Sequence, residues 1–500
     1  MSSAVEQLKQ HLGEIHDLSC ASRVLGWDQQ TYMPPGGARQ RAQHRATLSR
    51  LIHSKFTSEE TLRLLDAAEP ETQSLPEEHD DRCLVRIVRR DYERSRKLPS
   101  DFVAAWTRDA SLSNQVWREA RRANDFPAFR PHLESMMDYA RRAADYYGYE
   151  DHPYDALLDG YEPGLKTADV RRVLDVLHPA QVDLARAISQ KEAPRADFLY
   201  REYPEGAQGE FGLAVAAEFG YDLQRGRLDV APHPFETDFG RDDVRITTRY
   251  DCHYLPEAIF AIFHETGHAL YEQNISPSLS RTPLDSGCSN VFHESQSRLW
   301  ENLVSRSRSF WQRYFPRLRQ LFPAALADVT ADEFYRAVNR VQPSLIRVEA
   351  DEVTYNLHIM LRFELEMGLI ENQVGVADLP EVWAVKMREY LGVTPPDDRD
   401  GVMQDTHWST GSLGYFPTYA LGNVMGAQIY ETALQADPGI AAQINQGRFD
   451  GLRGWLGENL YQHGRKFLPG ELAVRVTGRP LDPQPYIAYL QHKFGELYGL

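Results

Sequence analysis

"LPEAIFAIFHETGHALYEQN", residues 255–274, predicts a helix that carries a metal site. Its apolar residues recur at three- and four-residue spacing, and Pro256 suits a first helical turn. His264 and His268 are four residues apart, and side chains at that spacing lie one above the other on a helix. Both imidazoles therefore face the same point in space, as a tetrahedral metal ion requires.

Glu265 follows His264 directly and is rotated about a third of a turn away from the histidine face. It can therefore reach a metal-activated water without being a ligand itself. The competing interpretation is a polar helix face that spells H-E-x-x-H by chance. That coincidence is expected only about a few times in a hundred sequences of this composition, and the helical context lowers it further.

A zinc site needs a third protein ligand, and "SNVFHESQSRLWENLVSR", residues 289–306, offers Glu294 in another helix-like segment. The separation 294 − 268 = 26 residues lets one helix end and a second cross it. His293 is the rival ligand, but a neighbouring ring would point off the face that carries Glu294. Two histidines and a glutamate with an open fourth position form a catalytic rather than a structural site.

This ligand set predicts amide hydrolysis without a covalent intermediate. The metal would activate a water, and Glu265 would act as general base, taking the water's proton and passing it to the leaving amine. Thermolysin-type sites place an aspartate four residues after the third ligand. Arg298 stands there in this chain, which excludes that branch.

Composition restricts the other function classes. The net charge of −17 disfavours nucleic acid and anionic membranes as main partners. Four widely spaced cysteines without a C-x-x-C pair indicate a reduced, intracellular protein. The N-terminus has no apolar signal-peptide core, and no run approaches the roughly 20 apolar residues of a membrane span. We therefore expect a cytoplasmic protein.

The pattern along the chain predicts a mostly α-helical fold. Residues 1 to about 225 look helical almost throughout. The residue composition changes between about 226 and 252, where β-branched residues and turn formers predict a small sheet. Helices follow to the C-terminus, with a second non-helical patch expected at 467–483. A single large helical body with two lobes fits this pattern best.

Six short motifs together carry a family resemblance. They are HPF at 233–235, D-x-R-x-T at 243–247, H-E-T-G-H at 264–268, H-E-S-Q-S-R at 293–298, I-R-x-x-A-D at 346–351 and G-x-x-Q-D-x-H-W at 401–408. With them, essentially the whole chain resembles the M32 family of metallocarboxypeptidases, the carboxypeptidase Taq type.

The resemblance implies a zinc- or cobalt-dependent enzyme that removes single C-terminal residues with broad side-chain tolerance. Two histidines and a glutamate also accept Mn²⁺. It further implies a cytoplasmic homodimer whose subunit is one peptidase domain over 1–500, two-lobed with a deep groove, similar to neurolysin and the angiotensin-converting enzymes. We expect the catalytic helices and groove mainly within 230–430, and an N-terminal helical lobe or lid at about 1–225.

An exopeptidase that acts at a C-terminus must bind a carboxylate, and the planar fork of arginine pairs with it bidentately. The resemblance makes Arg347 the carboxylate clamp. The alternative is a buried structural pair with Glu349 or Asp351. Arg245 raises the same question, and a structural role beside the strand is at least as plausible. His233 and Gln404 are expected as groove or structural contacts.

The segment 401–423 is rich in Gly, His, Trp and Tyr and predicts a loop over the groove. His407, Tyr415 and Tyr419 are donors for a tetrahedral oxyanion, as in related zinc peptidases, and the spacing slightly favours Tyr419 over Tyr415. Two other functions remain open from sequence. One is a neurolysin-like oligopeptide endopeptidase without a carboxylate clamp, and the other is a metal-free helical binding protein.

Overall fold

The computed structural model describes residues 3–500 and confirms a mostly helical fold. The chain divides into two compact units, each assembled from three separate segments. Since each unit draws on early, central and late parts of the chain, this division differs from a lobe boundary near residue 225. The first unit comprises Met1–Arg96, Arg195–Val338 and Ile429–Arg479, and the second comprises Lys97–Pro194, Asn339–Gln428 and Pro480–Leu500.

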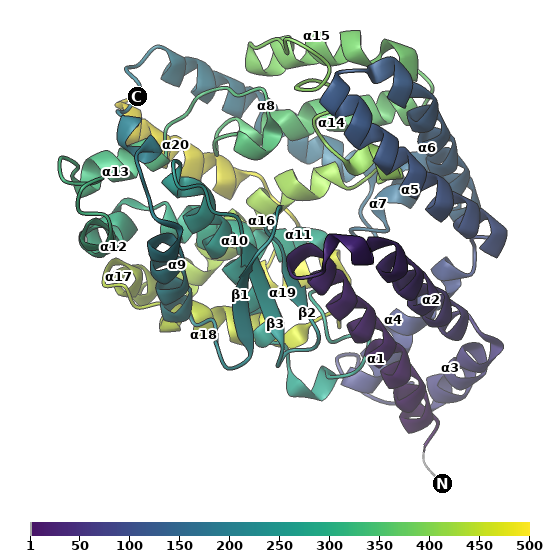
Figure 1. Ribbon diagram of the computed structural model, residues 1–500. Helices are drawn as coiled ribbons and strands as arrows, with labels where there is room; N and C mark the ends of the chain where they lie inside the picture. The colour runs from purple at the N-terminus through teal and green to yellow at the C-terminus, as the bar shows by residue number, and fades with distance from the viewer. Residues whose placement is uncertain (1–2) are drawn as a thin grey trace. The chain divides into compact units, whose positions relative to one another are not determined.

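The first unit contains helices from all three of its segments and the sheet (Figure 1). Its α-helices are α1 (Ala4–Thr31), α2 (Ala38–Phe56), α3 (Glu59–Thr72), α4 (Asp80–Ser95), α9 (Glu205–Phe219), α10 (Leu255–Gln273), α11 (Asn290–Arg298), α12 (Arg308–Leu321), α13 (Ala331–Val338), α17 (Gly439–Asn445), α18 (Asp450–Asn459) and α19 (Pro469–Thr477). A π-helix, Leu299–Ser305, continues α11.

The second unit is helical. Its helices are α5 (Ser100–Ala123), α6 (Phe126–Tyr147), α7 (Pro153–Leu158), α8 (Thr167–Ser189), α14 (Tyr355–Ile370), α15 (Leu379–Leu391) and α20 (Gln484–Tyr498), with short 3₁₀ turns at Arg347–Glu349 and His407–Thr410. Helix α16 (Phe416–Ala436) begins in the second unit, and its last turns belong to the first.

The small sheet forms where the sequence predicts it. Its strands are β1 (Gly226–Val230), β2 (Glu236–Asp238) and β3 (Val244–Thr248), in the order β1-β3-β2. β1 runs parallel to β3, with Gly226 opposite Val244, and β2 runs antiparallel, with Glu236 opposite Ile246. The central strand β3 and the edge strand β2 both contact α10, so the sheet supports the histidine-bearing helix from one side.

Helix α10 is buried on nearly all sides, more than a single apolar stripe requires. Besides the sheet it contacts α9 and α11. Phe263, the residue before His264, is fully buried and makes ring contacts with Phe219 and Phe310. Burying one such side chain contributes about 1.5–3 kcal/mol, so this packing makes the histidine-bearing turn rigid.

The expected non-helical patch at 467–483 is wrong in its first half, where α19 forms. The prolines and β-branched residues suggest a strand or loop, but Pro469 occupies the first turn of the helix, where proline is tolerated. The Glu471 carboxylate accepts a hydrogen bond from the Leu468 backbone N–H, and Gly478 ends the helix at a φ of 75°.

No helix within residues 3–500 combines the length and the apolar character needed to cross a lipid bilayer.

Candidate metal centre and arginine cluster

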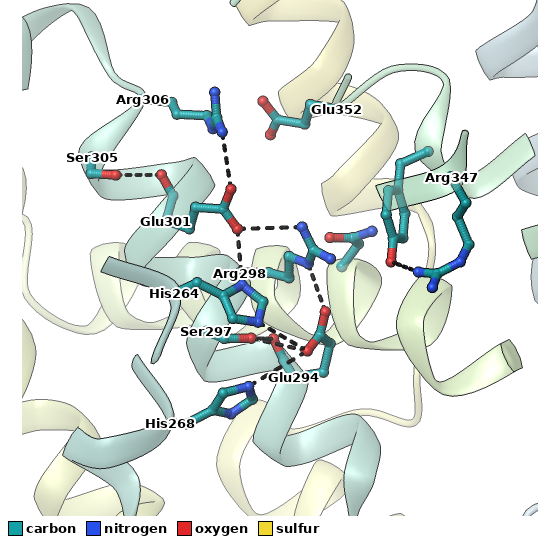
Figure 2. Close-up of polar contacts among 12 residues, drawn as sticks. His264, His268, Glu294, Ser297, Arg298, Glu301, Ser305, Arg306, Arg347 and Glu352 are labelled. Carbon is teal, nitrogen blue, oxygen red and sulfur yellow. Dashed lines mark hydrogen bonds and ion pairs between the residues drawn. The ribbon is translucent and has the colours of Figure 1, made fainter. Parts of the chain in front are cut away.

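Three predicted ligands meet in the first unit. His264 and His268 extend from α10, and Glu294 extends from α11 (Figure 2). Glu294 Oε2 lies 3.6 Å from His264 Nε2 and 3.7 Å from His268 Nε2. All three ligand atoms lie within 4.8 Å of one another. Tetrahedral ligands at about 2.1 Å from a metal are about 3.4 Å apart, so the geometry fits a divalent cation.

Gly267 allows this meeting of α10 and α11. A Cβ at this position would lie 2.5 Å from the Gln296 carbonyl oxygen and 2.6 Å from Ser297 Cα. These are backbone atoms of α11, which no side-chain rotation can move away. Only glycine between the two histidines lets the helix that carries Glu294 approach so closely.

A carboxylate orients His264 from the side away from the ligands. Glu301 Oε2 lies 2.9 Å from His264 Nδ1, so Nδ1 carries the proton and Nε2 presents its lone pair to the metal. Glu301 also accepts hydrogen bonds from Arg298 at 3.3 Å and Arg306 at 3.0 Å. Together the two guanidiniums and His264 outweigh burial and hold the pKa of Glu301 well below its usual range.

His268 is oriented by a two-step hydrogen-bond chain. Its Nδ1 lies 2.8 Å from His293 Nδ1, and His293 Nε2 lies 2.7 Å from Glu272 Oε1. If each ring donates toward Glu272, His268 Nε2 keeps its lone pair for the metal. Burial, with added repulsion from His293, holds the pKa of His268 well below 6.5. His293 therefore contacts a predicted ligand, His268, and is not one of the three residues whose ligand atoms converge.

Glu265 is 6% exposed and lies directly after His264 on α10. Burial raises its pKa to about 7, His264 opposes that rise, and the Glu294 and Glu301 carboxylates add to it. A carboxyl group with a pKa near neutrality exchanges protons readily at physiological pH, which suits a general base.

The second unit gathers five of the other predicted side chains. Arg347 is 5% exposed, and its guanidinium pairs with Asp405 at 2.8 Å and donates to the Tyr355 hydroxyl at 2.7 Å. The expected alternatives, Glu349 and Asp351, are not its partners. The pair spans 58 residues of sequence.

His407, Tyr415 and Tyr419 form one aromatic cluster, in which Tyr419 contacts the Arg347 guanidinium. The ring centroids of His407 and Tyr415 are 5.3 Å apart, and those of Tyr415 and Tyr419 are 5.2 Å apart. His407 Nε2 lies 3.3 Å from the Tyr419 hydroxyl, and the Arg347 guanidinium lies 4.8 Å from the Tyr419 ring centroid. Burial lowers the pKa of His407 to about 4, so the ring is neutral at neutral pH.

Two side chains hold the 401–415 segment in place. Gln404 accepts from the Arg347 backbone N–H at 2.9 Å and donates to the Leu345 carbonyl oxygen at 3.0 Å. Glu366 on α14 is fully buried and accepts three hydrogen bonds, from the Tyr154 hydroxyl, Trp408 Nε1 and the Gly414 backbone N–H. Burial raises the pKa of Glu366 to about 7.

The two remaining predicted residues belong to the first unit. Arg245 forms a bidentate pair with Asp243, with both distances 2.8 Å, and its guanidinium lies 4.3 Å from the Trp27 ring centroid. These contacts give it a structural partner next to the sheet. His233 is exposed in the loop between β1 and β2.

Several residues that contact the predicted site residues were not predicted from the sequence. Glu301 had a usable signal, since it follows Glu294 by seven residues and so falls on the same helix face. Asp405 lies within the G-x-x-Q-D-x-H-W motif at 401–408, but nothing near it in the sequence indicates that its partners are arginines. Arg362, Glu366 and Gly267 offered no local signal, because their partners are distant in sequence or are backbone atoms.

Comparison with known proteins identifies the family of this chain. A sequence profile described as carboxypeptidase Taq (M32) metallopeptidase matches residues 7–494. Thermostable carboxypeptidase 1 of Thermus thermophilus is 41% identical over 508 residues, covering 99% of both chains. Carboxypeptidase 1 of Bacillus subtilis is 38% identical over 490 residues, covering 98% of this chain and 97% of its own.

A solved structure of an M32 carboxypeptidase is also similar to this chain over its full length. The M32 carboxypeptidase from Deinococcus radiodurans superposes with a TM-score of 0.97 at 43% identity, covering 99% of this chain and 100% of that one. Full-length coverage at this identity shows that the protein belongs to the carboxypeptidase Taq (M32) metallopeptidase family and is a metal-dependent carboxypeptidase.

Proposed function

We propose that this enzyme hydrolyses the C-terminal peptide bond of peptides with broad side-chain tolerance, using Glu265 as general base. The observation that carries the proposal is the convergence of His264, His268 and Glu294 within 4.8 Å, next to a buried carboxyl of raised pKa. Zn²⁺ is the proposed metal, with Co²⁺ or Mn²⁺ as alternatives that the same ligands accept.

A divalent metal held by these ligands supplies Lewis-acid activation of a water and of the scissile carbonyl. The protein groups do the rest. Glu265 takes a proton from the attacking water and delivers it to the leaving amine, so that one carboxylate serves both steps. Glu301 and His293 keep each histidine in the tautomer that presents Nε2 to the metal.

Arg347 is the proposed clamp for the substrate's terminal carboxylate. Arginine has five N–H donors, and the hydrogen bonds to Asp405 and Tyr355 engage three of those on Arg347. One N–H on each terminal nitrogen takes no part in these bonds, and a bidentate pair with a carboxylate needs one N–H from each of two guanidinium nitrogens. Gln404, Arg245 and His233 have a supporting rather than a chemical role in this proposal.

Tyr419 is the preferred oxyanion donor, with His407 and Tyr415 as its neighbours. Its hydroxyl lies within reach of His407, and its ring lies against the Arg347 guanidinium. A neutral His407 holds that hydroxyl in place without adding a charge. Preorganised donors of this kind typically contribute about 10²–10³-fold to turnover.

The test is digestion of one peptide with a free C-terminus and with an amidated C-terminus, read by mass spectrometry after chelation and after metal add-back. Only the free peptide should lose its terminal residue, and only with metal present. Equal cleavage of the amidated peptide would instead establish the neurolysin-like endopeptidase, which the carboxypeptidase relatives do not favour. Glu265→Gln should retain metal but lose turnover, whereas retained activity would place the base elsewhere.

The family resemblance also leads us to propose a cytoplasmic homodimer. Light scattering of the purified protein checks the dimer, and a monomer at micromolar concentration would contradict it.

A further inference from the structure

Two buried arginines share a single carboxylate in the second unit. Arg347 and Arg362 are 5% and 0% exposed. Asp405 Oδ1 accepts from Arg347 Nε at 3.1 Å and Nη2 at 2.8 Å. Asp405 Oδ2 lies 2.8 Å from Arg362 Nε and 2.6 Å from Arg362 Nη2. Each oxygen of the carboxylate is therefore committed to one guanidinium.

Gln404 ties the same two arginines together a second time. Its side-chain oxygen accepts from the Arg347 backbone N–H at 2.9 Å and from Arg362 Nη2 at 2.8 Å. The backbone and the side chain of Arg347 are thus both linked to Arg362, through Gln404 and Asp405. Arg362 itself is anchored on α14, where its Nη1 donates to the His358 carbonyl oxygen at 2.6 Å.

The two arginines differ in what their donors do. Arg362 is 0% exposed and its guanidinium donates to three protein groups, Asp405, Gln404 and the His358 carbonyl oxygen, whereas the hydrogen bonds of the Arg347 guanidinium reach only Asp405 and Tyr355 and leave one N–H on each terminal nitrogen. Arg362 therefore holds the cluster together, and Arg347 keeps the fork that an external carboxylate would bind.

The cluster also carries a surplus of positive charge. Two guanidiniums face one carboxylate, and within residues 3–500 no second carboxylate hydrogen-bonds to either arginine. Burial keeps the pKa of both neighbouring histidines low, His358 well below 6.5 and His407 about 4, so neither adds charge at neutral pH. Glu366 acts on Arg362 only through longer-range electrostatics, and burial raises its pKa to about 7. A buried charge without a full partner is costly, and a substrate anion would remove that cost.

We propose that Arg362 is a positioning residue for the carboxypeptidase reaction: through Asp405 and Gln404 it fixes the Arg347 guanidinium and keeps the cluster cationic, so that it selects a terminal carboxylate over a carboxamide. The inference rests on the proposed clamp role of Arg347. Without Arg362, Asp405 would neutralise Arg347 one to one, and both the charge surplus and the alignment of the fork would be lost.

The test compares N-acetyl-L-phenylalanine with its carboxamide as inhibitors of the full-length, metal-loaded enzyme. Arg362→Met should weaken inhibition by the carboxylate about 10- to 100-fold, the range for losing charge-assisted hydrogen bonding, and leave inhibition by the carboxamide unchanged. For a peptide substrate, KM should rise by a similar factor while kcat stays within a few-fold. A residue with only a structural role would weaken both inhibitors equally.

Arg141→Met is the matched control. Arg141 donates to the Leu369 carbonyl oxygen of the same helix α14 and has no carboxylate in that contact. In the Arg141→Met variant, the ratio of the inhibition constants for the carboxylate and the carboxamide should equal that of the wild type. The metal content of the variant should also be unchanged.

The Arg347→Met variant distinguishes a failure of the positioning role of Arg362 from a failure of the proposed clamp role of Arg347. If Arg347→Met and Arg362→Met both lose the discrimination, the inference stands. If Arg347→Met loses it while Arg362→Met retains it, Arg362 has no positioning role and the clamp survives. If Arg347→Met retains it, the clamp is wrong and the inference falls with it. Should Arg362→Met not fold, Arg362→Lys keeps the charge without the planar fork and should give an intermediate ratio, and a wild-type ratio in that variant would overturn the inference.

Discussion

Replacing Glu301 with glutamine tests how far this metal site depends on residues that do not touch the metal. The carboxylate accepts from His264 Nδ1 at 2.9 Å and pairs with Arg306 at 3.0 Å and Arg298 at 3.3 Å. Its side chain is only 10% exposed, so solvent screens these contacts little. The amide oxygen of glutamine can still accept a hydrogen bond, but the negative charge is lost.

The expected loss in metal affinity follows from these contacts. A hydrogen bond to a charged group contributes about 1.5–3 kcal/mol, and removing the charge forfeits much of that. Arg298, which also donates to Glu294 Oε1 at 2.7 Å, would lose its second anionic partner and compete more strongly for the ligand carboxylate. We expect Glu301→Gln to weaken metal binding about 10- to 100-fold, within the range for partners of metal-bound histidines.

Competition with a chromophoric chelator at pH 7.5 measures the metal Kd directly. Glu371→Gln is the control, because Glu371 lies 2.7 Å from His152 Nε2 in a histidine–carboxylate pair of the second unit that contains none of the predicted ligands. Its metal Kd should match that of the wild type. A change of less than about threefold in Glu301→Gln, in a variant with an unaltered melting temperature, would refute the idea that Glu301 tunes His264.

Three further outcomes are expected. Gly267→Ala should lower the free energy of unfolding by about 1–3 kcal/mol and weaken metal binding, because the added methyl group meets the α11 backbone. Calorimetry and the chelator assay check these two effects. An unchanged stability and an unchanged metal Kd would contradict the close approach of the two helices. Removing the metal should lower Tm, and re-adding it should restore Tm in a concentration-dependent way; a Tm indifferent to metal would argue against binding by the folded state. Glu366 has a pKa of about 7 in the folded protein and about 4.3 in the unfolded chain, so the folded state binds its proton more tightly. Its contribution to stability is therefore greatest below about pH 4.3. That contribution falls as the pH rises towards 7, by up to about 1.4 kcal/mol per pH unit. Glu366→Gln removes that dependence, so its Tm loss should be larger at pH 5 than at pH 7.5, and an equal loss at both would place the pKa of Glu366 near its ordinary value.

The four-residue spacing of His264 and His268 and the acid between them were readable from sequence, because helix geometry is local. The small sheet was readable for the same reason, from a short alternating segment with turn formers around it. Helix α19 was missed because its prolines and β-branched residues carry a strand-like local signal, whereas the positions of Pro469 and Gly478 at its ends determine the structure.

Sequence by itself therefore determined the chemistry available to this protein: two histidines on one helix face, a carboxylate for the third ligand, a base beside them, and motifs shared with a peptidase family. Only the tertiary structure decided which distant groups complete that chemistry. It gave Arg347 the partner Asp405 instead of the nearby Glu349 or Asp351, and it paired Arg362 with the same Asp405 carboxylate. Spacing along one helix follows from backbone geometry, but pairings across tens of residues depend on how whole helices pack.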